Sequence, residues 1–78
     1  MPRNKVREWI DGTITKCDVC GFQFYEGCTM YDAVVLHSGG TWGYLCCECQ
    51  KFKTMAGHMD KEEAWNCRKF VYKPYIKN

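Results

Sequence analysis

The sequence predicts a small α+β domain, and three observations lead to that prediction. Two Cys-x-x-Cys pairs, at 17–20 and 46–49, are separated by a segment long enough to hold a β-hairpin. Within that segment, Gly39-Gly40 has strand-forming residues on either side, which is typical of a tight hairpin loop. After the second pair, apolar residues recur at helical spacing. We therefore expect a hairpin that leads into two short helices toward the C-terminus.

The two cysteine pairs have the spacing of a tetrahedral zinc site formed by Cys17, Cys20, Cys46 and Cys49. Each pair can place two thiolates at about 2.3 Å from one Zn²⁺ ion. Because protein ligands would fill all four positions, no place remains for water or substrate, and the ion is predicted to be structural. Cys47 offers an alternative to Cys46 in a Cys-x-Cys arrangement, although Cys-x-x-Cys fits a metal-binding knuckle better. The sequence thus predicts one structural Zn²⁺ and no catalytic residue.

The chain has 78 residues, which is enough for one domain at most. The hydrophobic core of so small a domain contributes roughly 3–5 kcal/mol to stability. A structural zinc ion contributes on the order of 10–16 kcal/mol of apparent binding free energy in finger peptides, so we expect folding to depend on metal. The zinc-binding core is predicted at about residues 13–59, followed by a helix and a tail at residues 60–78.

Composition is typical of a soluble protein in a reducing cytoplasm. The seven cysteines are an odd number and the N-terminus is highly charged, so neither a disulfide scaffold nor a signal peptide is expected. No apolar run approaches the roughly 18 residues of a membrane span. The net charge of +2 is too small to indicate nucleic acid binding by itself.

The segments before the hairpin carry weaker signals. Lys5–Asp11 has the flanking residues of a short helix. Thr13–Lys16 is predicted to be extended and to lead into the first cysteine pair. Gly21 is expected to adopt a positive φ in the turn of the first knuckle. Phe22–Asp32 is ambiguous between strand and turn.

The clearest local signal is the hairpin around Gly39-Gly40. Its strands are predicted at Ala33–Ser38 and Thr41–Leu45. If the two glycines form the whole loop, His37 lies opposite Trp42. Alternation then predicts an aromatic face with His37, Val35, Trp42 and Tyr44, and a buried aliphatic face with Val34, Leu36 and Leu45.

Two helices are predicted after the second cysteine pair. The first starts at Glu48 and ends near Gly57. The second begins at Asp60, whose spacing to Glu63 matches a capping box. The tail is strand-like up to Pro74, which fits only at an edge or beyond the ladder. The expected inner faces are Cys49, Phe52, Met55, Ala56 and Met59 in the first helix and Ala64, Cys67 and Val71 in the second, while Gln50, Lys51, Lys53 and Thr54 are expected to face water.

The order of these elements resembles the treble-clef and related zinc-knuckle folds. Over residues 13–59, the Cys17–Gly21 knuckle and the run Trp42–Cys46 are similar to small zinc-binding proteins often carried by bacteriophages. The run Gly43–Gln50 resembles the second knuckle of the DksA/TraR regulators, which act on RNA polymerase, but their long N-terminal helical coil is missing. These resemblances imply zinc binding and, for a phage-encoded protein, a role in the host cytoplasm.

The run Leu36–Gly40, followed by the second cysteine pair, is also similar to part of the HNH endonuclease motif. That motif implies a general-base histidine beside metal ligands that activate water. Here His37 has no adjacent Asp or His, and the expected Asn is missing. We therefore predict a binding or regulatory module and not an enzyme, with a degenerate HNH-like nuclease as the least favoured hypothesis.

Two surfaces are candidates for contact with a partner. The aromatic hairpin face with His37, Trp42 and Tyr44 suits a protein partner, such as part of the host machinery, because exposed aromatic clusters often form binding hot spots. The alternative is a nucleic acid, with lysines on phosphates and tyrosines stacked on bases. The basic tail could instead be an edge strand whose rings pack on the core. The nucleic acid candidates are Lys51, Lys53, Arg68, Lys69, Tyr72, Lys73, Tyr75 and Lys77.

The remaining cysteines and histidines lack motif spacing. Cys28, His37, Cys47, His58 and Cys67 could form a second metal site. Small buried thiols and ordinary surface histidines are the simpler interpretation of these residues. No base is paired with any of the cysteines in the sequence, so none is predicted to be a nucleophile.

Overall fold

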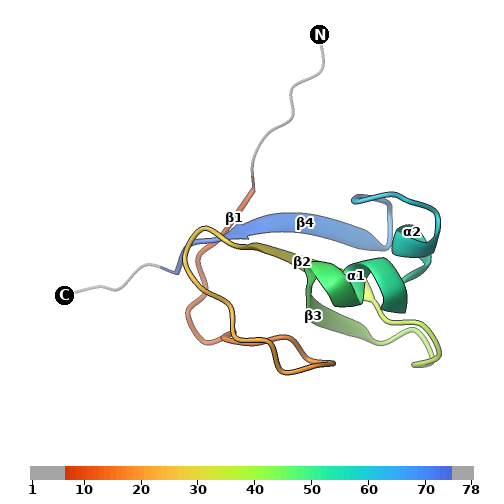
Figure 1. The fold of residues 1–78 in the computed structure, drawn as a ribbon, viewed down its shortest axis with the longest axis horizontal. Helices are drawn as coiled ribbons and strands as arrows, with labels where there is room; N and C mark the ends of the chain where they lie inside the picture. The colour runs from red at the N-terminus through yellow and green to blue at the C-terminus, as the bar shows by residue number, and fades with distance from the viewer. Residues whose placement is uncertain (1–6, 75–78) are drawn as a thin grey trace, which may run out of the picture.

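A computed structural model describes residues 7–74, which form a four-stranded sheet with two short helices on one face (Figure 1). The strands lie in the order β1-β4-β2-β3, in which β1 is parallel to β4 and the other neighbours are antiparallel. The predicted α+β class is confirmed. The strands are β1 (Glu8–Trp9), β2 (Thr29–Val34), β3 (Trp42–Cys46) and β4 (Cys67–Tyr72), and the helices are α1 (Cys47–Lys53) and α2 (Met55–His58).

Strand β1 stands where a helix was predicted at Lys5–Asp11, so that prediction is wrong for the described part of the segment. Trp9 packs against the rings of Tyr44 and Phe70, with centroid distances of 5.1 and 5.0 Å. These aromatic contacts, together with the pairing of β1 with β4, outweigh the local helix signal. Positions 5 and 6 lie outside the described residues.

Strands β2 and β3 form the predicted hairpin, but in a different register. Trp42 lies opposite Val34 and Tyr44 lies opposite Asp32, so the predicted pairing of His37 with Trp42 is wrong. The predicted aliphatic face is also wrong. Leu45 pairs with Tyr31 on one face of the sheet, Val34 points to the other face, and Leu36 lies in the loop.

The hairpin loop is longer than Gly39-Gly40, and hydrogen bonds of the Ser38 hydroxyl across the loop hold it closed. The hydroxyl of Ser38 donates to the carbonyl oxygen of Val35 at 2.5 Å and accepts from the amide of Thr41 at 3.0 Å. His37 precedes Ser38 with a φ of 61°, which is uncommon for a residue with a Cβ. These local bonds fix a loop that a two-residue turn rule does not describe.

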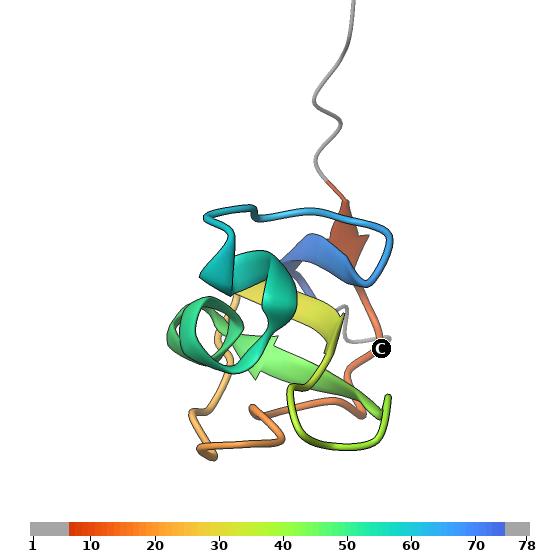
Figure 2. The ribbon, with the colours of Figure 1, turned by 90° about the vertical axis from the view of Figure 1, so that its right-hand side faces the viewer.

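Helices α1 and α2 lie side by side on the same side of the sheet, with a break at Thr54 (Figure 2). The hydroxyl of Thr54 donates to the carbonyl oxygen of Gln50 at 2.5 Å and accepts from the amide of Gly57 at 2.9 Å, which caps α2. The Gln50 amide donates to the carbonyl oxygen of Lys61 at 2.8 Å. Gln50 and Thr54 are therefore buried, and the prediction that they face water is wrong. Gly57 lies within α2 and does not end it.

The apolar side chains predicted for the inner helix face are mostly exposed. Phe52, Met55 and Met59 are 63, 51 and 55% exposed. Burial of Cys49 and Gln50 determines which side of α1 faces the core. Because the chain breaks at Thr54, α2 does not continue the helical periodicity of α1. Only Cys49 and Ala56 of the predicted inner face are buried.

Within the described residues, no helix follows α2, so the second helix predicted from Asp60 is wrong. Ala64 and Cys67 exchange backbone hydrogen bonds of 2.9 and 3.2 Å, which close a tight turn before β4. Glu63, the residue expected to complete the capping box, instead pairs with Arg7 and accepts from the backbone amide of Lys69 at 3.3 Å. The capping-box spacing is a local signal, and the pairing of β4 with two other strands overrides it.

Buried side chains lie on both faces of the sheet. Ala33, Leu45 and Cys67 are completely buried on the face that the helices cover, and Met30 is completely buried on the opposite face. Strand β4 is central and not an edge strand, and Pro74 follows beyond the ladder as predicted. No helix in residues 7–74 is long and apolar enough to cross a membrane.

Candidate metal centre

The first knuckle, at residues 17–21, is a tight turn that presents two thiols. The amide of Gly21 donates to the carbonyl oxygen of Cys17 at 3.1 Å. Gly21 has a φ of 81°, as predicted, and a side chain there would be strained. Of the extended stretch predicted at Thr13–Lys16, only an isolated bridge between Lys16 and Gln23 forms.

Two hydrogen bonds dock this knuckle onto β3. The amide of Asp18 donates to the carbonyl oxygen of Tyr44 at 2.8 Å, and the carboxylate of Asp18 accepts from the Tyr44 amide at 2.8 Å. Strand β3 ends at Cys46, and α1 begins at the next residue. The docking therefore brings the first cysteine pair next to the second.

The sulfur atoms of the two pairs form one cluster, in which all lie within 4.8 Å of one another. A tetrahedral site with metal–sulfur distances of about 2.3 Å has sulfur–sulfur edges of about 3.8 Å. The Sγ atoms of Cys20 and Cys46 are 3.6 Å apart, which fits such an edge. The cluster consists of Cys17, Cys46 and Cys49, which are buried, and Cys20, which is exposed. Its geometry can hold a metal ion such as zinc.

The four thiols differ in proton affinity because of burial and crowding. Burial raises the pKa of Cys49, and the neighbouring thiols of Cys17, Cys20 and Cys46 raise it further. At Cys17 burial opposes ionisation, but amide hydrogen bonds from Cys20, Cys46 and Val19 bring the pKa down to about 7. Thiolates packed this closely need a compensating cation, which a divalent metal ion supplies.

The chain matches no family model, no curated protein and no solved structure. The candidate metal centre therefore rests on the geometry of the four cysteines. The resemblance to phage-type zinc-knuckle proteins stays a prediction.

The remaining cysteines lie outside the cluster. Cys47, the alternative ligand, is exposed at the start of α1. The thiol of Cys28 accepts from the amide of Tyr25 at 3.4 Å, and the thiol of Cys67 donates to the carbonyl oxygen of Glu62 at 3.3 Å. Across residues 7–74, no second group of three or more metal-ligating side chains occurs.

The three hairpin residues predicted to contact a partner are not all on one strand face. Trp42 and Tyr44 share a face of β3. Tyr44 is half-buried against Trp9, whereas Trp42 is exposed. His37 is exposed in the hairpin loop, away from the strand ladder.

The basic residues predicted to contact nucleic acid are only partly available. Lys69 pairs with Glu62 at 2.7 Å and Lys73 pairs with Glu8 at 3.7 Å. The ring of Tyr72 is buried, so it has no free face for a base. Lys51, Lys53 and Arg68 are exposed, and Tyr75 and Lys77 lie outside the described residues.

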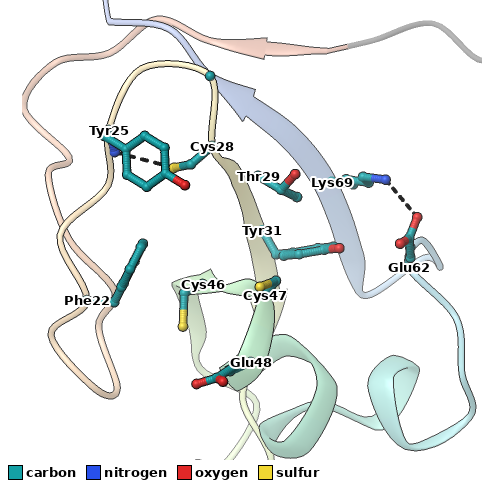
Figure 3. A pocket seen from close by; sticks show the side chains of 11 residues that line it. Phe22, Tyr25, Cys28, Thr29, Tyr31, Cys46, Cys47, Glu48, Glu62 and Lys69 are labelled. Atoms are coloured by element: carbon teal, nitrogen blue, oxygen red, sulfur yellow. Dashed lines mark hydrogen bonds and ion pairs between the residues drawn. The ribbon is translucent and has the colours of Figure 1, made fainter.

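A cleft of about 600 Å³ opens beside the metal centre (Figure 3). Phe22 and Tyr25 stand on one side, and Lys69 and Glu62 stand on the opposite side, with Tyr31 between them. Little in the sequence indicates this cleft, since its walls come from an ambiguous segment, from α1 and from the segment around β4. The aromatic run at residues 22–25 was the one available signal.

Proposed function

We propose that the protein is a small zinc-stabilised binding module that contacts a protein partner. Four thiolates in a compact tetrahedral arrangement suit Zn²⁺ and do not suit Mg²⁺ or Ca²⁺, which prefer oxygen ligands. Since the protein fills all four positions, the ion is structural. The order of knuckle, hairpin and helix around the cluster supports a treble-clef-type arrangement.

The proposal of a protein partner rests on exposed apolar side chains on the side of the sheet that the helices cover. Phe52 in α1, Met55 in α2 and Met59, which directly follows α2, are each more than half exposed. Trp65, at the turn before β4, is 83% exposed. Large apolar side chains at such exposure are typical of protein interfaces, where methionine adapts its shape to the partner.

A nucleic acid is the alternative that an experiment must separate from a protein partner. Lys51 and Lys53 are exposed on the same helix as Phe52, and the ammonium of Lys51 lies 5.9 Å from the ring centroid of Phe52. Binding through these lysines would weaken steeply as salt rises, because phosphate contacts release counterions. Binding through the apolar side chains would depend much less on salt.

The test is capture of a partner from a lysate of the cells in which the protein is produced. The immobilised zinc-loaded chain is compared with a Phe52→Ser/Met55→Ser variant, and a Lys53→Ser variant of α1 serves as the matched control. We expect one protein to be retained by the wild type and the control and lost by the apolar variant, while zinc content and circular dichroism stay unchanged. Retention that disappears on nuclease treatment, or that is equal in all three chains, would contradict the proposal.

A further inference from the structure

The cleft beside the metal centre carries a more specific inference about the partner. We propose that it binds an arginine side chain of the partner protein, held between the rings of Phe22 and Tyr25 and the carboxylate of Glu48. The inference rests on the proposed function, since it names a feature of the same partner.

The aromatic wall of the cleft is open to a ligand. Phe22 and Tyr25 are 44 and 62% exposed, and their ring centroids lie 6.2 Å apart at an interplanar angle of 65°. The two rings therefore form a corner that faces the cleft (Figure 3). A guanidinium is attracted to aromatic faces within about 6 Å and stacks on them because it is planar and weakly hydrated.

The charges of the cleft favour a cation. The carboxylate of Glu62 is already neutralised by the ammonium of Lys69 at 2.7 Å. The carboxylate of Glu48 has no hydrogen bond or ion pair with any other described residue. One free carboxylate therefore remains at the cleft. A thiolate cluster with a divalent ion stays anionic, so the adjacent Cys46 adds to the negative potential.

Other ligands fit this set of groups less well. A phosphate of a nucleic acid would meet the free carboxylate of Glu48, and the only cation of the cleft, Lys69, is already paired. An apolar side chain would leave the carboxylate of Glu48 without a partner in a desolvated site. A lysine would supply a point charge, but it lacks the plane that stacks between Phe22 and Tyr25.

The proposal is tested by nuclear magnetic resonance on the full zinc-loaded chain. The probe is Nα-acetyl-arginine amide, and Nα-acetyl-citrulline amide is the neutral control of the same shape. We expect the arginine probe, and not the citrulline probe, to shift the amide resonances of Tyr25, Thr29 and Glu48. Weak binding is expected, because one side chain is a small ligand.

Four variants report on the separate contacts. Tyr25→Ala and Glu48→Gln should each weaken binding of the arginine probe by about three- to tenfold, given the cation–π and charge contacts that they remove. Glu26→Gln is the matched control, because Glu26 is exposed and outside the cleft lining. Lys69→Met should strengthen binding, since it frees Glu62. Zinc content and the amide spectrum show whether each variant is folded.

The outcomes separate this proposal from the proposed function. Equal shifts with the citrulline probe, or equal affinity of the Glu48→Gln and Glu26→Gln variants, would overturn the arginine proposal. Capture of a partner that depends on Phe52 but not on Glu48 would also overturn it, while the proposed function would stand. Arginine binding without any captured protein would support the cleft and contradict the proposed function.

Discussion

Substitution of Gly57 by alanine tests how closely α1 and α2 approach each other. A Cβ at Gly57 would overlap the carbonyl oxygen of Gln50 and lie 2.6 Å from both the Cα and the carbonyl oxygen of Lys51. These are backbone atoms of α1, so they cannot rotate away as a flexible side chain would. The two helices would have to separate to admit the methyl group.

The expected magnitude follows from opposing effects. Alanine in place of glycine inside a helix normally stabilises it by about 1 kcal/mol. Forcing a methyl group into a filled space costs typically about 1–3 kcal/mol, and more when backbone must move. Separation of the helices would also weaken the bond of 2.9 Å from the Gly57 amide to Thr54, a helix cap of a kind worth about 1 kcal/mol. We expect a net loss of about 2 kcal/mol, which lowers Tm by roughly 10 °C in so small a domain.

The assay is thermal and urea denaturation followed by circular dichroism at a fixed free zinc concentration, because bound metal shifts the apparent stability. Gly12→Ala is the matched control, since its Cβ would meet only Pro74 at an ordinary 3.5 Å. The control should differ little from the wild type. A Gly57→Ala chain as stable as the wild type, or more stable, would refute the close approach of the helices.

Substitutions at four further positions test other parts of the structure. Thr54→Val, followed by urea denaturation, should cost about 1–2 kcal/mol because it removes the cap of α2, and Thr54→Ser should restore most of it. Burial raises the pKa of Asp32 despite the opposing charge of Arg68, so Asp32→Asn should stabilise the chain by less than about 1 kcal/mol at pH 7. That gain should be absent below the unfolded-state pKa of Asp32, grow as pH rises above it, and be complete above the raised folded-state pKa, as a pH series of denaturation curves would show. Cys47→Ser should keep its zinc by metal analysis, whereas Cys46→Ser should lose it.

The opposite results would contradict these interpretations in specific ways. If Thr54→Ser were as damaging as Thr54→Val, the hydroxyl would not be the cap. A stability difference for Asp32→Asn that persists at low pH, where the wild-type carboxyl is neutral, would not come from the charge. Loss of zinc from the Cys47→Ser chain would show that Cys47, and not Cys46, is the metal ligand.

The features that the sequence predicted correctly are those with local signals. The Cys-x-x-Cys spacing predicted which thiols cluster, and the turn between them predicted the positive φ of Gly21. Strand propensity around Gly39-Gly40 predicted a hairpin. Each of these depends on a few consecutive residues, so the surrounding fold did little to change them.

The features that were predicted wrongly depend on contacts between distant residues. Strand β4 replaces a capped helix because it pairs with both β1 and β2, and Glu63, the residue expected to complete the capping box, instead pairs with Arg7. The hairpin register depends on one hydroxyl, that of Ser38. Burial of Gln50 depends on a carbonyl oxygen from the loop after α2. No periodicity in the sequence encodes such partners.

The cleft could not be predicted for the same reason. Its lining joins Phe22 and Tyr25, in the segment between β1 and β2, to Glu48 on α1 and to Lys69 on β4. These segments are distant in the sequence and meet only in the folded chain. The location of the site is therefore a property of the tertiary fold.

The most direct test of a metal-dependent fold is native mass spectrometry of the purified full chain, with circular dichroism before and after chelation. The four clustered thiols predict one zinc ion per chain, and folding that is lost when the ion is removed and regained when zinc is returned. A chain that carries no metal, or that stays folded after the metal is removed, would contradict it.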